Sequence, residues 1–330
     1  MSDSFRALVL DRSGDQFESG IRMLPMSALP DYPVLVRVSY SSMNYKDSLA
    51  VTDRGKIVRR FPIVPGIDLA GVVEESADPR FRPGDAVLCT GCGIGEEEWG
   101  GYSAYARLKP EWIVPIPAGL DARRAMSLGT AGFTAMLCVE ALERHDVTPE
   151  KGDVLVTGAS GGVGSIAVML LAKLGFRVVA VSGKPEAARQ LIDYGASETL
   201  PREAFSEPGK SLESARWAGA VDTVGGSTLA RVLAQTMLYG CVAACGNAGG
   251  AALNATVFPF ILRGVTLAGI SSVNQPLSAR QRLWPRLAQL ISHEALDRNT
   301  TEINLNQVHD YADRIFRGEV RGRILVRMGE

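Results

Sequence analysis

The sequence predicts an α/β protein in which a β-rich part of the chain is followed by a doubly wound parallel sheet. Up to about Asp121, short apolar runs alternate with Gly, Pro and Asp residues, a pattern typical of strands and turns. From residue 154 onward, strand-like and helix-like segments alternate, which is typical of a parallel sheet. A glycine-rich turn joins the first of these strands to its helix. The doubly wound part is therefore inserted within the chain.

Each element follows from its residues. In the β-rich part, apolar runs between turn residues predict strands at 7–10, 34–40 and 86–89. A helix is expected at 125–143. The alternating part that follows has strands at 154–157, 176–181, 221–224 and 240–245, and helices at 163–174, 185–194 and 229–235. Beyond Val265 we expect one strand, two amphipathic helices and a closing strand at 323–327.

The glycine turn indicates a dinucleotide site of the Rossmann type. Residues 159–164, Ala-Ser-Gly-Gly-Val-Gly, match the pattern G-x-G-x-x-G with alanine at the first position. Gly161 would let the backbone approach a pyrophosphate, and Gly164 would let the helix pack closely on its strand. The helix apolar face at Val163, Ile166 and Leu170 supplies the structural context that the pattern needs.

The end of the next strand predicts which dinucleotide binds. Enzymes that use NAD usually carry Asp or Glu there to accept from the ribose 2′-OH. This chain has Ser182, Gly183 and Lys184, whose hydroxyl, amide and ammonium groups suit a 2′-phosphate. We therefore favour NADP(H), with the alternative that Lys184 is only a solvated residue at the start of a helix.

Composition excludes several classes of function. The chain of 330 residues is 46% hydrophobic and 22% charged with a net charge of −1, so neither nucleic-acid binding nor an acidic scaffold is indicated. The N-terminus lacks a signal-type pattern, and we see no apolar stretch near the ~20 residues of a membrane span. Five cysteines are typical of reduced thiols. We expect a cytoplasmic protein that does not bind membranes.

Several motifs in order give the chain a resemblance to a known family. They are Pro65–Gly71 as Pro-Gly-Ile-Asp-Leu-Ala-Gly, and the segments 42–47, 61–68, 81–87, 99–101, 129–137, 181–184, 217–225 and 241–246. The chain resembles the medium-chain dehydrogenase/reductase superfamily, its quinone-oxidoreductase-like branch and, within that, the acrylyl-CoA reductase family. The resemblance implies a GroES-like catalytic domain at 1–125 and 266–330 and a Rossmann NADP-binding domain at 126–265.

Zinc is not expected, although many members of the superfamily bind it. A zinc alcohol dehydrogenase would have a Cys near residue 44 and a His where Ile67 stands, and this chain has Asn44 and Tyr45 at the first of these places. Cys89 and Cys92 are spaced like half of a zinc clamp without a second pair nearby. We interpret them as small buried packing residues.

The resemblance implies NADPH-dependent reduction of acryloyl-CoA to propanoyl-CoA without a metal. Two alternatives remain open: an NADPH-dependent quinone or alkenal (enone) reductase, and a nucleotide-bound protein without turnover. The expected partner is a small acyl-CoA substrate. Relatives commonly form homodimers through an edge strand, which would be near 265–270 here.

Asn44 and Tyr45 are the candidate catalytic residues. Asn44 could donate to a substrate carbonyl, and Tyr45 could donate, line the cofactor or serve as a packing aromatic. The resemblance implies that Tyr45 contacts the cofactor. It also implies the rest of the cofactor site: Ser160, Gly161, Gly162 and Val163 at the pyrophosphate, Ser182, Gly183 and Lys184 at the 2′-phosphate, Arg202 near the adenosine, and Asn247, Ile261, Ser272 and Arg323 completing the cleft. Arg323 has an alternative interpretation as a solvated residue at the head of the last strand.

Overall fold

The computed structural model describes residues 3–207 and 209–329, which form two compact units. Unit 1 contains the described residues up to 130 together with 273–288 and 296–329. Unit 2 contains Ala131–Ser272 and Gln289–Ala295. The expected α/β class with a GroES-like part and a Rossmann part is confirmed. The expected division into domains at 125/126 and 265/266 stays a prediction. Unit 2 includes the strand Thr266–Gly269, and its first segment ends at Ser272.

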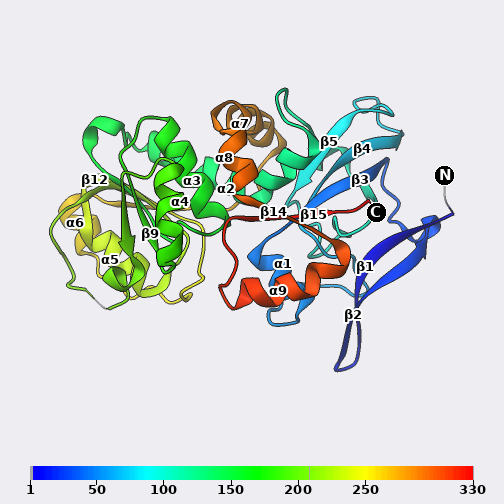
Figure 1. Cartoon of the computed structure of the whole chain (residues 1–330), viewed down its shortest axis with the longest axis horizontal. Coiled ribbons are helices and arrows are strands. Elements are labelled where there is room, and N and C mark those ends of the chain that lie inside the picture. The colour runs from blue at the N-terminus through cyan, green and yellow to red at the C-terminus, as the bar shows by residue number, and fades with distance from the viewer. Residues whose placement is uncertain (1–2, 208, 330) are drawn as a thin grey trace. The chain divides into compact units, whose positions relative to one another are not determined.

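Unit 1 is built mainly of antiparallel strands (Figure 1). A hairpin pairs β1 with β2, and a seven-stranded sheet has the order β14-β15-β3-β4-β5-β7 with β6 also paired to β3. The strands are β1 (Ser4–Ser13), β2 (Gln16–Pro25), β3 (Val34–Met43), β4 (Asp68–Ser76), β5 (Ala86–Thr90), β6 (Tyr105–Leu108), β7 (Val114–Pro115), β14 (Thr300–Asn304) and β15 (Arg323–Arg327). Its helices include α1 (Tyr45–Val51), α7 (Leu277–Leu290) and α9 (Val308–Phe316).

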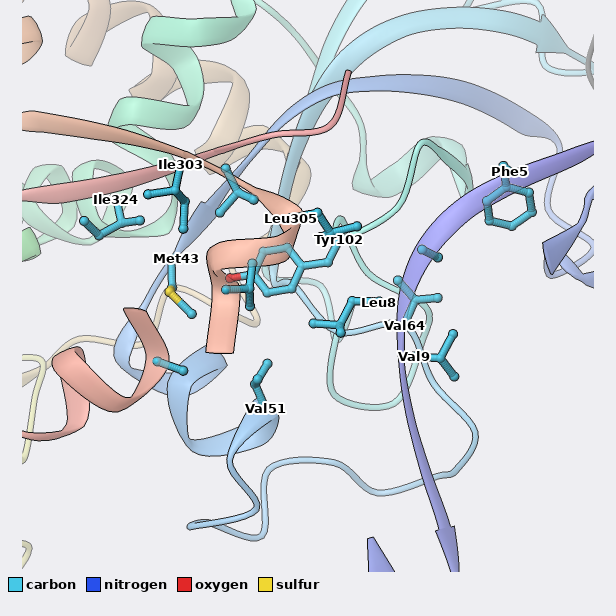
Figure 2. Packing of buried hydrophobic residues seen from close by; sticks show 14 residues of the cluster. Phe5, Leu8, Val9, Met43, Val51, Val64, Tyr102, Ile303, Leu305 and Ile324 are labelled. Carbon is cyan, nitrogen blue, oxygen red and sulfur yellow. The ribbon is translucent and has the colours of Figure 1, made fainter. Parts of the chain in front are cut away.

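The core of unit 1 forms because its central strands carry runs of residues that are buried. Figure 2 shows one cluster, in which Leu8 of β1, Met43 of β3, Val51 of α1 and Ile324 of β15 gather with the fully buried Tyr102. The Tyr102 hydroxyl donates to the Ser42 carbonyl at 3.2 Å, so this large ring carries its polar end into a hydrogen bond. The cluster therefore fixes the end of β3, where α1 begins.

Unit 2 is a six-stranded sheet, parallel throughout, in the order β10-β9-β8-β11-β12-β13. Its strands are β8 (Val154–Val156), β9 (Val178–Ser182), β10 (Glu198–Pro201), β11 (Trp217–Asp222), β12 (Thr236–Ala244) and β13 (Thr266–Gly269), and its helices α3 (Gly162–Lys173), α4 (Ala188–Asp193), α5 (Gly226–Gln235) and α6 (Phe258–Arg263) surround them in Figure 1. This is the strand order of a doubly wound dinucleotide-binding sheet.

Several details differ from the sequence expectations. The strand expected at 221–224 is β11, which begins at Trp217 and ends at Asp222, because Thr223 and Val224 already turn toward α5. The strands β2, β4, β6, β7, β10 and β14 and the helices α1 and α6 were not expected. Among the described residues 266–329 there are three α-helices rather than two, since α8 (His293–Arg298) follows α7 closely.

The long helix α2 (Ala122–Arg144) changes direction at Gly129. This helix is long and apolar enough to cross a membrane by length and composition, which the sequence expectation overlooked, but 83% of its most apolar window is buried inside the protein. Gly129 has φ 52°, and a Cβ atom there would come within 2.6 Å of both the Asp68 carboxylate and the Ser42 hydroxyl. Only glycine fits, because the kink presses the backbone against these polar groups.

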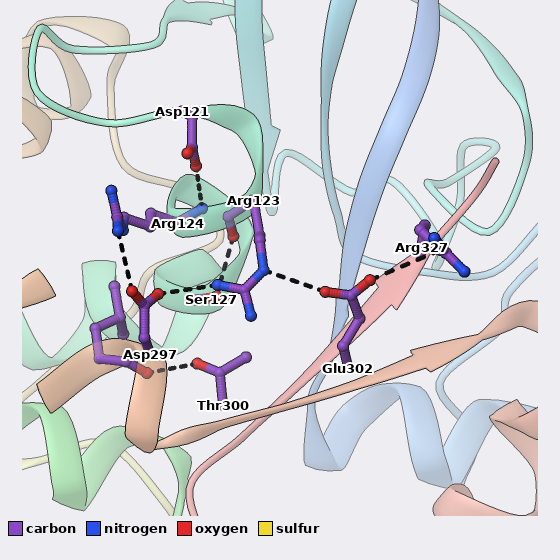
Figure 3. Close-up of polar contacts among 9 residues, drawn as sticks. Asp121, Arg123, Arg124, Ser127, Asp297, Thr300, Glu302 and Arg327 are labelled. Atoms are coloured by element: carbon purple, nitrogen blue, oxygen red, sulfur yellow. Dashed lines mark hydrogen bonds and ion pairs between the residues drawn. The ribbon is translucent and has the colours of Figure 1, made fainter. Parts of the chain in front are cut away.

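Ion pairs hold the first turn of α2 within unit 1, as Figure 3 shows. Arg123 contacts Asp297 at 2.9 Å and Glu302 at 3.1 Å, and Arg124 contacts the other oxygen of Asp297 at 3.0 Å. The hydrogen bond from Arg124 is the largest cause that lowers the pKa of Asp297. The Ser127 hydroxyl donates back to the Arg123 carbonyl at 3.0 Å. This network orients the turn that leads to Gly129.

Candidate active site and dinucleotide site

The glycine turn after β8 has the shape that a pyrophosphate requires. β8 ends at Val156, and α3 begins at Gly162 with Gly161 as its N-cap, so the N-terminal amides of α3 are presented at the turn. A Cβ on Gly164 would lie 2.3 Å from the Gly158 carbonyl oxygen, which requires glycine for close packing of helix on strand. The turn glycine is Gly158, with φ 59°, rather than Ala159, which is buried. These residues fit a dinucleotide.

Asp222 and two threonines brace this turn, and the sequence analysis did not identify them. The buried Thr157 hydroxyl donates to Asp222 at 2.6 Å, and the Thr223 hydroxyl donates to the Thr157 carbonyl at 2.9 Å. Asp222 also accepts from the Gly225 amide at 2.8 Å. Burial raises the pKa of Asp222 against the effect of these hydrogen bonds. The bracing joins the ends of β8 and β11, which are neighbours in the sheet.

The residues expected at a 2′-phosphate lie together at the end of β9. The Ser182 hydroxyl donates to the Ser160 hydroxyl at 2.9 Å and accepts from the Lys184 amide at 3.1 Å. A Cβ on Gly183 would lie 2.7 Å from the Arg202 side chain, which is therefore packed over this glycine. The Arg202 side chain is 74% exposed. The structure thus gathers hydroxyl, amide and guanidinium groups at the end of β9.

The other expected cofactor residues are spread over unit 2 and unit 1. Asn247 is exposed in the loop after β12, and its carbonyl accepts from the Gly250 amide at 3.0 Å. Ile261 lies on α6 with 68% of its surface exposed, and Ser272 follows β13. Arg323 opens β15 and is only 2% exposed, so its interpretation as a solvated residue is wrong.

Asn44 and Tyr45 stand where β3 ends and α1 begins. Asn44 is the N-cap of α1, and its backbone amide donates to Asp47 at 2.8 Å, as in a capping box. Tyr45, the first residue of α1, is 42% exposed. An exposed ring at a helix start is available to a ligand, so the packing role considered for Tyr45 is not favoured.

The Asn44 side chain is held by two buried carboxylates. Its Nδ2 donates to Asp68 at 2.9 Å and to Asp47 at 3.1 Å, while its Oδ1 accepts from Arg323 at 3.3 Å. Both amide hydrogens are therefore directed at acids, and a donor role toward a substrate carbonyl would require one of these bonds to break. The geometry favours Asn44 as a group that positions the start of α1.

Asp68 is the centre of this network. It is fully buried and accepts from the Ser42 hydroxyl at 2.5 Å and from the Thr130 amide and hydroxyl at 2.9 and 2.5 Å. Arg323 donates to the Ser42 hydroxyl at 2.9 Å and to the Ser127 carbonyl at 2.9 Å. Sequence reasoning noted Asp68 only as part of a motif, because its partners lie far away along the chain. The groups that donate to Asp68, which belong to Ser42, Asn44 and Thr130, all lie in unit 1.

Asp47 is a second buried acid in this network, and it titrates unusually. It is 1% exposed and accepts from the Ile67 amide at 2.9 Å. Burial, with a further contribution from the charge of Asp68, raises its pKa from 3.8 to about 7. Burial also lowers the pKa of the Arg323 guanidinium.

We expect Asp47 to make the protein less stable as the pH rises. Between about pH 4 and pH 7 the folded chain binds a proton at Asp47 that the unfolded chain has lost, so the free energy of unfolding falls over this range. The Asp47→Asn variant lacks this contribution. Urea unfolding of both proteins from pH 4 to pH 8 should give a wild-type-minus-variant difference that falls up to about pH 7 and then levels off. A difference independent of pH would contradict the raised pKa.

No metal-binding arrangement is present in the part of the chain that the structure describes, where no three His, Cys, Asp or Glu residues come together suitably. Asn44 and Ile67, which stand at positions of zinc ligands in related dehydrogenases, belong to the polar network and to the core. All five cysteines are free of disulfides. Cys92 is half-buried at a turn, so the expectation of a buried packing residue holds for Cys89 alone.

Comparisons with known proteins give the family. Residues 30–118 match the alcohol dehydrogenase GroES-like domain, and residues 162–293 match the zinc-binding dehydrogenase family. The chain is 50% identical to the probable acrylyl-CoA reductase AcuI of Escherichia coli over 98% of this chain and 99% of that protein. It is 49% identical to the acrylyl-CoA reductase AcuI of Ruegeria pomeroyi, covering 98% of each.

A solved structure gives the same result. The crystal structure of the yhdH oxidoreductase from Salmonella enterica in complex with NADP is 50% identical and superposes with a TM-score of 0.96 over 98% of this chain and 100% of that one. The fold and the family that the sequence predicted are confirmed. The chain therefore belongs to the acrylyl-CoA reductase family of the medium-chain dehydrogenase/reductase superfamily.

Proposed function

We propose that this protein reduces the C=C bond of acryloyl-CoA to give propanoyl-CoA, with NADPH as the electron donor. The observation that carries the proposal is 49–50% identity to two proteins named acrylyl-CoA reductase over nearly the full length of each. The glycine turn after β8 and the donors after β9 support it, since they suit the pyrophosphate and 2′-phosphate of NADPH.

The residues that we propose for cofactor binding are those that the sequence analysis named. Ser160, Gly161, Gly162 and Val163 would bind the pyrophosphate, and Ser182, Gly183, Lys184 and Arg202 would bind the 2′-phosphate and adenosine, with further contacts from Tyr45, Asn247, Ile261, Ser272 and Arg323. Asn247 is exposed, and it would contribute through its backbone. For the buried Arg323, a direct contact competes with its bonds to Ser42 and Ser127.

The chemistry needs an electrophilic β-carbon and a stabilised carbonyl oxygen. When bound, NADPH supplies the hydride, and the thioester carbonyl makes the β-carbon of the double bond electrophilic. A donor near the carbonyl oxygen would stabilise the negative charge that develops there. The Tyr45 hydroxyl is our candidate for this donor, because its ring is exposed whereas both amide hydrogens of Asn44 are engaged. Reduction of an activated alkene in this way requires no zinc, and we propose a zinc-independent enzyme.

The test is a comparison of substrates at fixed NADPH. We expect kcat/KM for acryloyl-CoA to exceed that for a free enone and for a simple quinone, because CoA supplies binding energy that the others lack. A higher value for the quinone or the enone would move the function to a quinone or alkenal reductase. Tight NADPH binding without turnover of any alkene would indicate a protein that has lost activity.

Replacing Ser182 with Asp is expected to reverse the cofactor preference. The new carboxylate would repel the 2′-phosphate and accept from a 2′-OH, and like charges brought together at a binding site cost several kcal/mol. We expect the ratio of kcat/KM for NADPH to that for NADH to fall by about 100-fold. Ser182→Ala is the matched control, since it removes the hydroxyl without adding a charge. An unchanged ratio in Ser182→Asp would place the 2′-phosphate elsewhere.

We also propose that the protein is a homodimer joined through unit 2. Strand β13 is an edge strand of the parallel sheet, and exposed apolar residues adjoin it: Leu238 at 61%, Tyr239 at 70% and Leu262 at 60%. A Cβ on Gly264, just before β13, would lie 2.8 Å from the Tyr239 ring, so Tyr239 lies beside the start of this edge strand. We propose that the three exposed apolar residues belong to one patch. Such patches mark protein interfaces. We place the protein in the cytoplasm, because five free thiols suit a reducing compartment.

The dimer is expected to dissociate when a charge enters this patch. Light scattering of the wild type should give the mass of two chains, and Leu262→Lys should shift it toward one, since an unpaired charge is costly in an apolar interface. Met23→Lys is the control, because Met23 is 63% exposed on β2, a strand of unit 1 that is not part of the proposed patch. A single-chain mass for the wild type, or equal masses for the two variants, would contradict the interface.

A further inference from the structure

Cys89 and Cys92 form a thiol pair that the proposed reaction does not use. Cys89 lies in β5 and is fully buried, whereas Cys92 lies just beyond the strand and is half-buried. The two side chains are joined by a thiol–thiol hydrogen bond. Gly91 has φ 67° and Cys92 has φ 57°, so the backbone turns where β5 ends at Thr90, between the two cysteines. Cys92 is thus the more exposed residue of the pair, and Cys89 is the buried one.

A buried guanidinium stands beside the pair. Arg280 of α7 is 1% exposed and donates to the Thr90 carbonyl at 2.6 Å and to the Thr90 hydroxyl at 3.1 Å. It also donates to the Val273 carbonyl at 2.9 Å, and that same carbonyl accepts from the Cys92 amide at 3.2 Å. These bonds fix a positive charge next to the turn that carries both thiols.

This setting makes Cys92 the thiol that ionises first. The hydrogen bond from Cys89 and the charge of Arg280 lower the pKa of Cys92 to about 7, although partial burial and the charge of Glu111 oppose them. The same hydrogen bond and full burial raise the pKa of Cys89 well above its ordinary value. A thiolate at neutral pH is the reactive form of cysteine.

We propose that Cys89 and Cys92 are a redox modification site, which a hydroperoxide converts into an intramolecular disulfide. The Cys92 thiolate attacks the peroxide, an S–O bond forms as the O–O bond breaks, and the alkoxide or hydroxide that leaves takes up a proton. The Cys89 thiol then attacks the Cys92 sulfur, an S–S bond forms, and the hydroxide leaves with the Cys89 proton as water. Two thiols are oxidised to one disulfide. An organic hydroperoxide is reduced to its alcohol and one water, and hydrogen peroxide to two waters.

The pair lies beside the polar network of unit 1. In the β4–β5 register Cys89 pairs with Leu69 and Thr90 pairs with Asp68. The Gly91 amide donates to the Ile67 carbonyl at 2.9 Å, and the Ile67 amide donates to Asp47. The turn that the disulfide would span is therefore hydrogen-bonded to Ile67. This residue precedes Asp68 and donates to Asp47. The proposal concerns the thiols themselves and does not depend on the substrate of the enzyme.

A second thiol pair in unit 2 provides a comparison. Cys138 is buried and hydrogen-bonded to Cys245, and the charge of Asp222 adds to the effects that raise its pKa. A negative charge disfavours a thiolate, whereas Arg280 favours one at Cys92. We expect the pair in unit 2 to react more slowly with peroxide.

Mass spectrometry of tryptic peptides tests the proposal. Trypsin releases residues 81–107 as one peptide, because the Arg82–Pro83 bond resists cleavage, and this peptide holds Cys89 and Cys92 as its only cysteines. After stoichiometric hydrogen peroxide at pH 7, the peptide should lose two hydrogen atoms, and dithiothreitol should restore them. Cys138 and Cys245 should remain alkylatable under the same conditions.

Variants assign the two roles. In Cys89→Ser and Cys89→Ala we expect oxidation to stop at a sulfenic acid on Cys92, which dimedone traps; alanine is included because serine would leave a hydroxyl in a buried position. In Cys92→Ser, Cys89 should stay a thiol. The proposal is overturned if the wild-type peptide keeps both thiols after Cys245 has been oxidised, or if Cys89 reacts equally fast in the Cys92→Ser variant.

Discussion

Replacing Asp68 with alanine is expected to lower the free energy of unfolding by about 3–5 kcal/mol, because a buried charge nearby and several buried donors would lose the carboxylate that compensates them. Asp68 accepts hydrogen bonds from Ser42, Asn44 and Thr130, and its loss would leave the buried Arg323 with less compensating charge. Equilibrium unfolding in urea measures the effect. Activity should fall as well, because Asn44 would lose an anchor that holds the start of α1 beside Tyr45.

Two further variants separate the buried charge from the hydrogen bonds. Thr130→Val removes the hydroxyl that donates to Asp68 and keeps the backbone amide that also donates to it. We expect the free energy of unfolding to fall by about 1 kcal/mol. Combining Asp68→Leu with Arg323→Met removes both charges, so the double variant should be more stable than the sum of the single losses predicts. Additive losses, or a loss below about 1 kcal/mol for Asp68→Ala, would contradict a coupled network at this place.

Gly164→Ala is expected to weaken NADPH binding by about 10- to 100-fold. The new Cβ would lie 2.3 Å from the Gly158 carbonyl oxygen, so α3 must move away from β8 and carry its N-terminal amides with it. Overpacking of this kind costs about 1–3 kcal/mol. Fluorescence titration with NADPH gives the dissociation constant directly.

Gly269→Ala is the matched control for that experiment. Gly269 ends β13 in the same unit, and a Cβ there would meet nothing within 4 Å. We expect the control to bind NADPH like the wild type. Equal binding by Gly164→Ala would show that the close packing of α3 on its strand is not needed for the cofactor.

The local features of this protein could be predicted from sequence, whereas its buried networks could not. The strand, turn and helix at 154–173 are contiguous, so apolar periodicity and glycine placement identify them directly. The Asp68 network joins Ser42, Thr130 and Arg323, which only the folded sheet brings together. Nothing in the neighbourhood of Arg323 along the chain indicates burial, and it was therefore open to interpretation as a surface residue.

The same reasoning explains the smaller errors. The pattern has alanine at its first position, Ala159, whereas the positive φ falls on Gly158, one residue earlier. β2 was missed because its residues are half-exposed or exposed throughout, which weakens the alternation that identifies a strand. The amide of Asn44 was free to serve a substrate in the sequence analysis, since its two carboxylate partners become neighbours only after α1 and β4 are formed.

The most direct test of the proposed reaction follows the transferred hydrogen. The enzyme would be supplied with acryloyl-CoA and NADPH that carries deuterium at the transferable position of the nicotinamide, and the acyl product would be analysed by mass spectrometry and NMR. We predict propanoyl-CoA with a single deuterium on the β-carbon. Oxidation of NADPH without deuterium in the acyl group, or no consumption of acryloyl-CoA, would contradict the reaction.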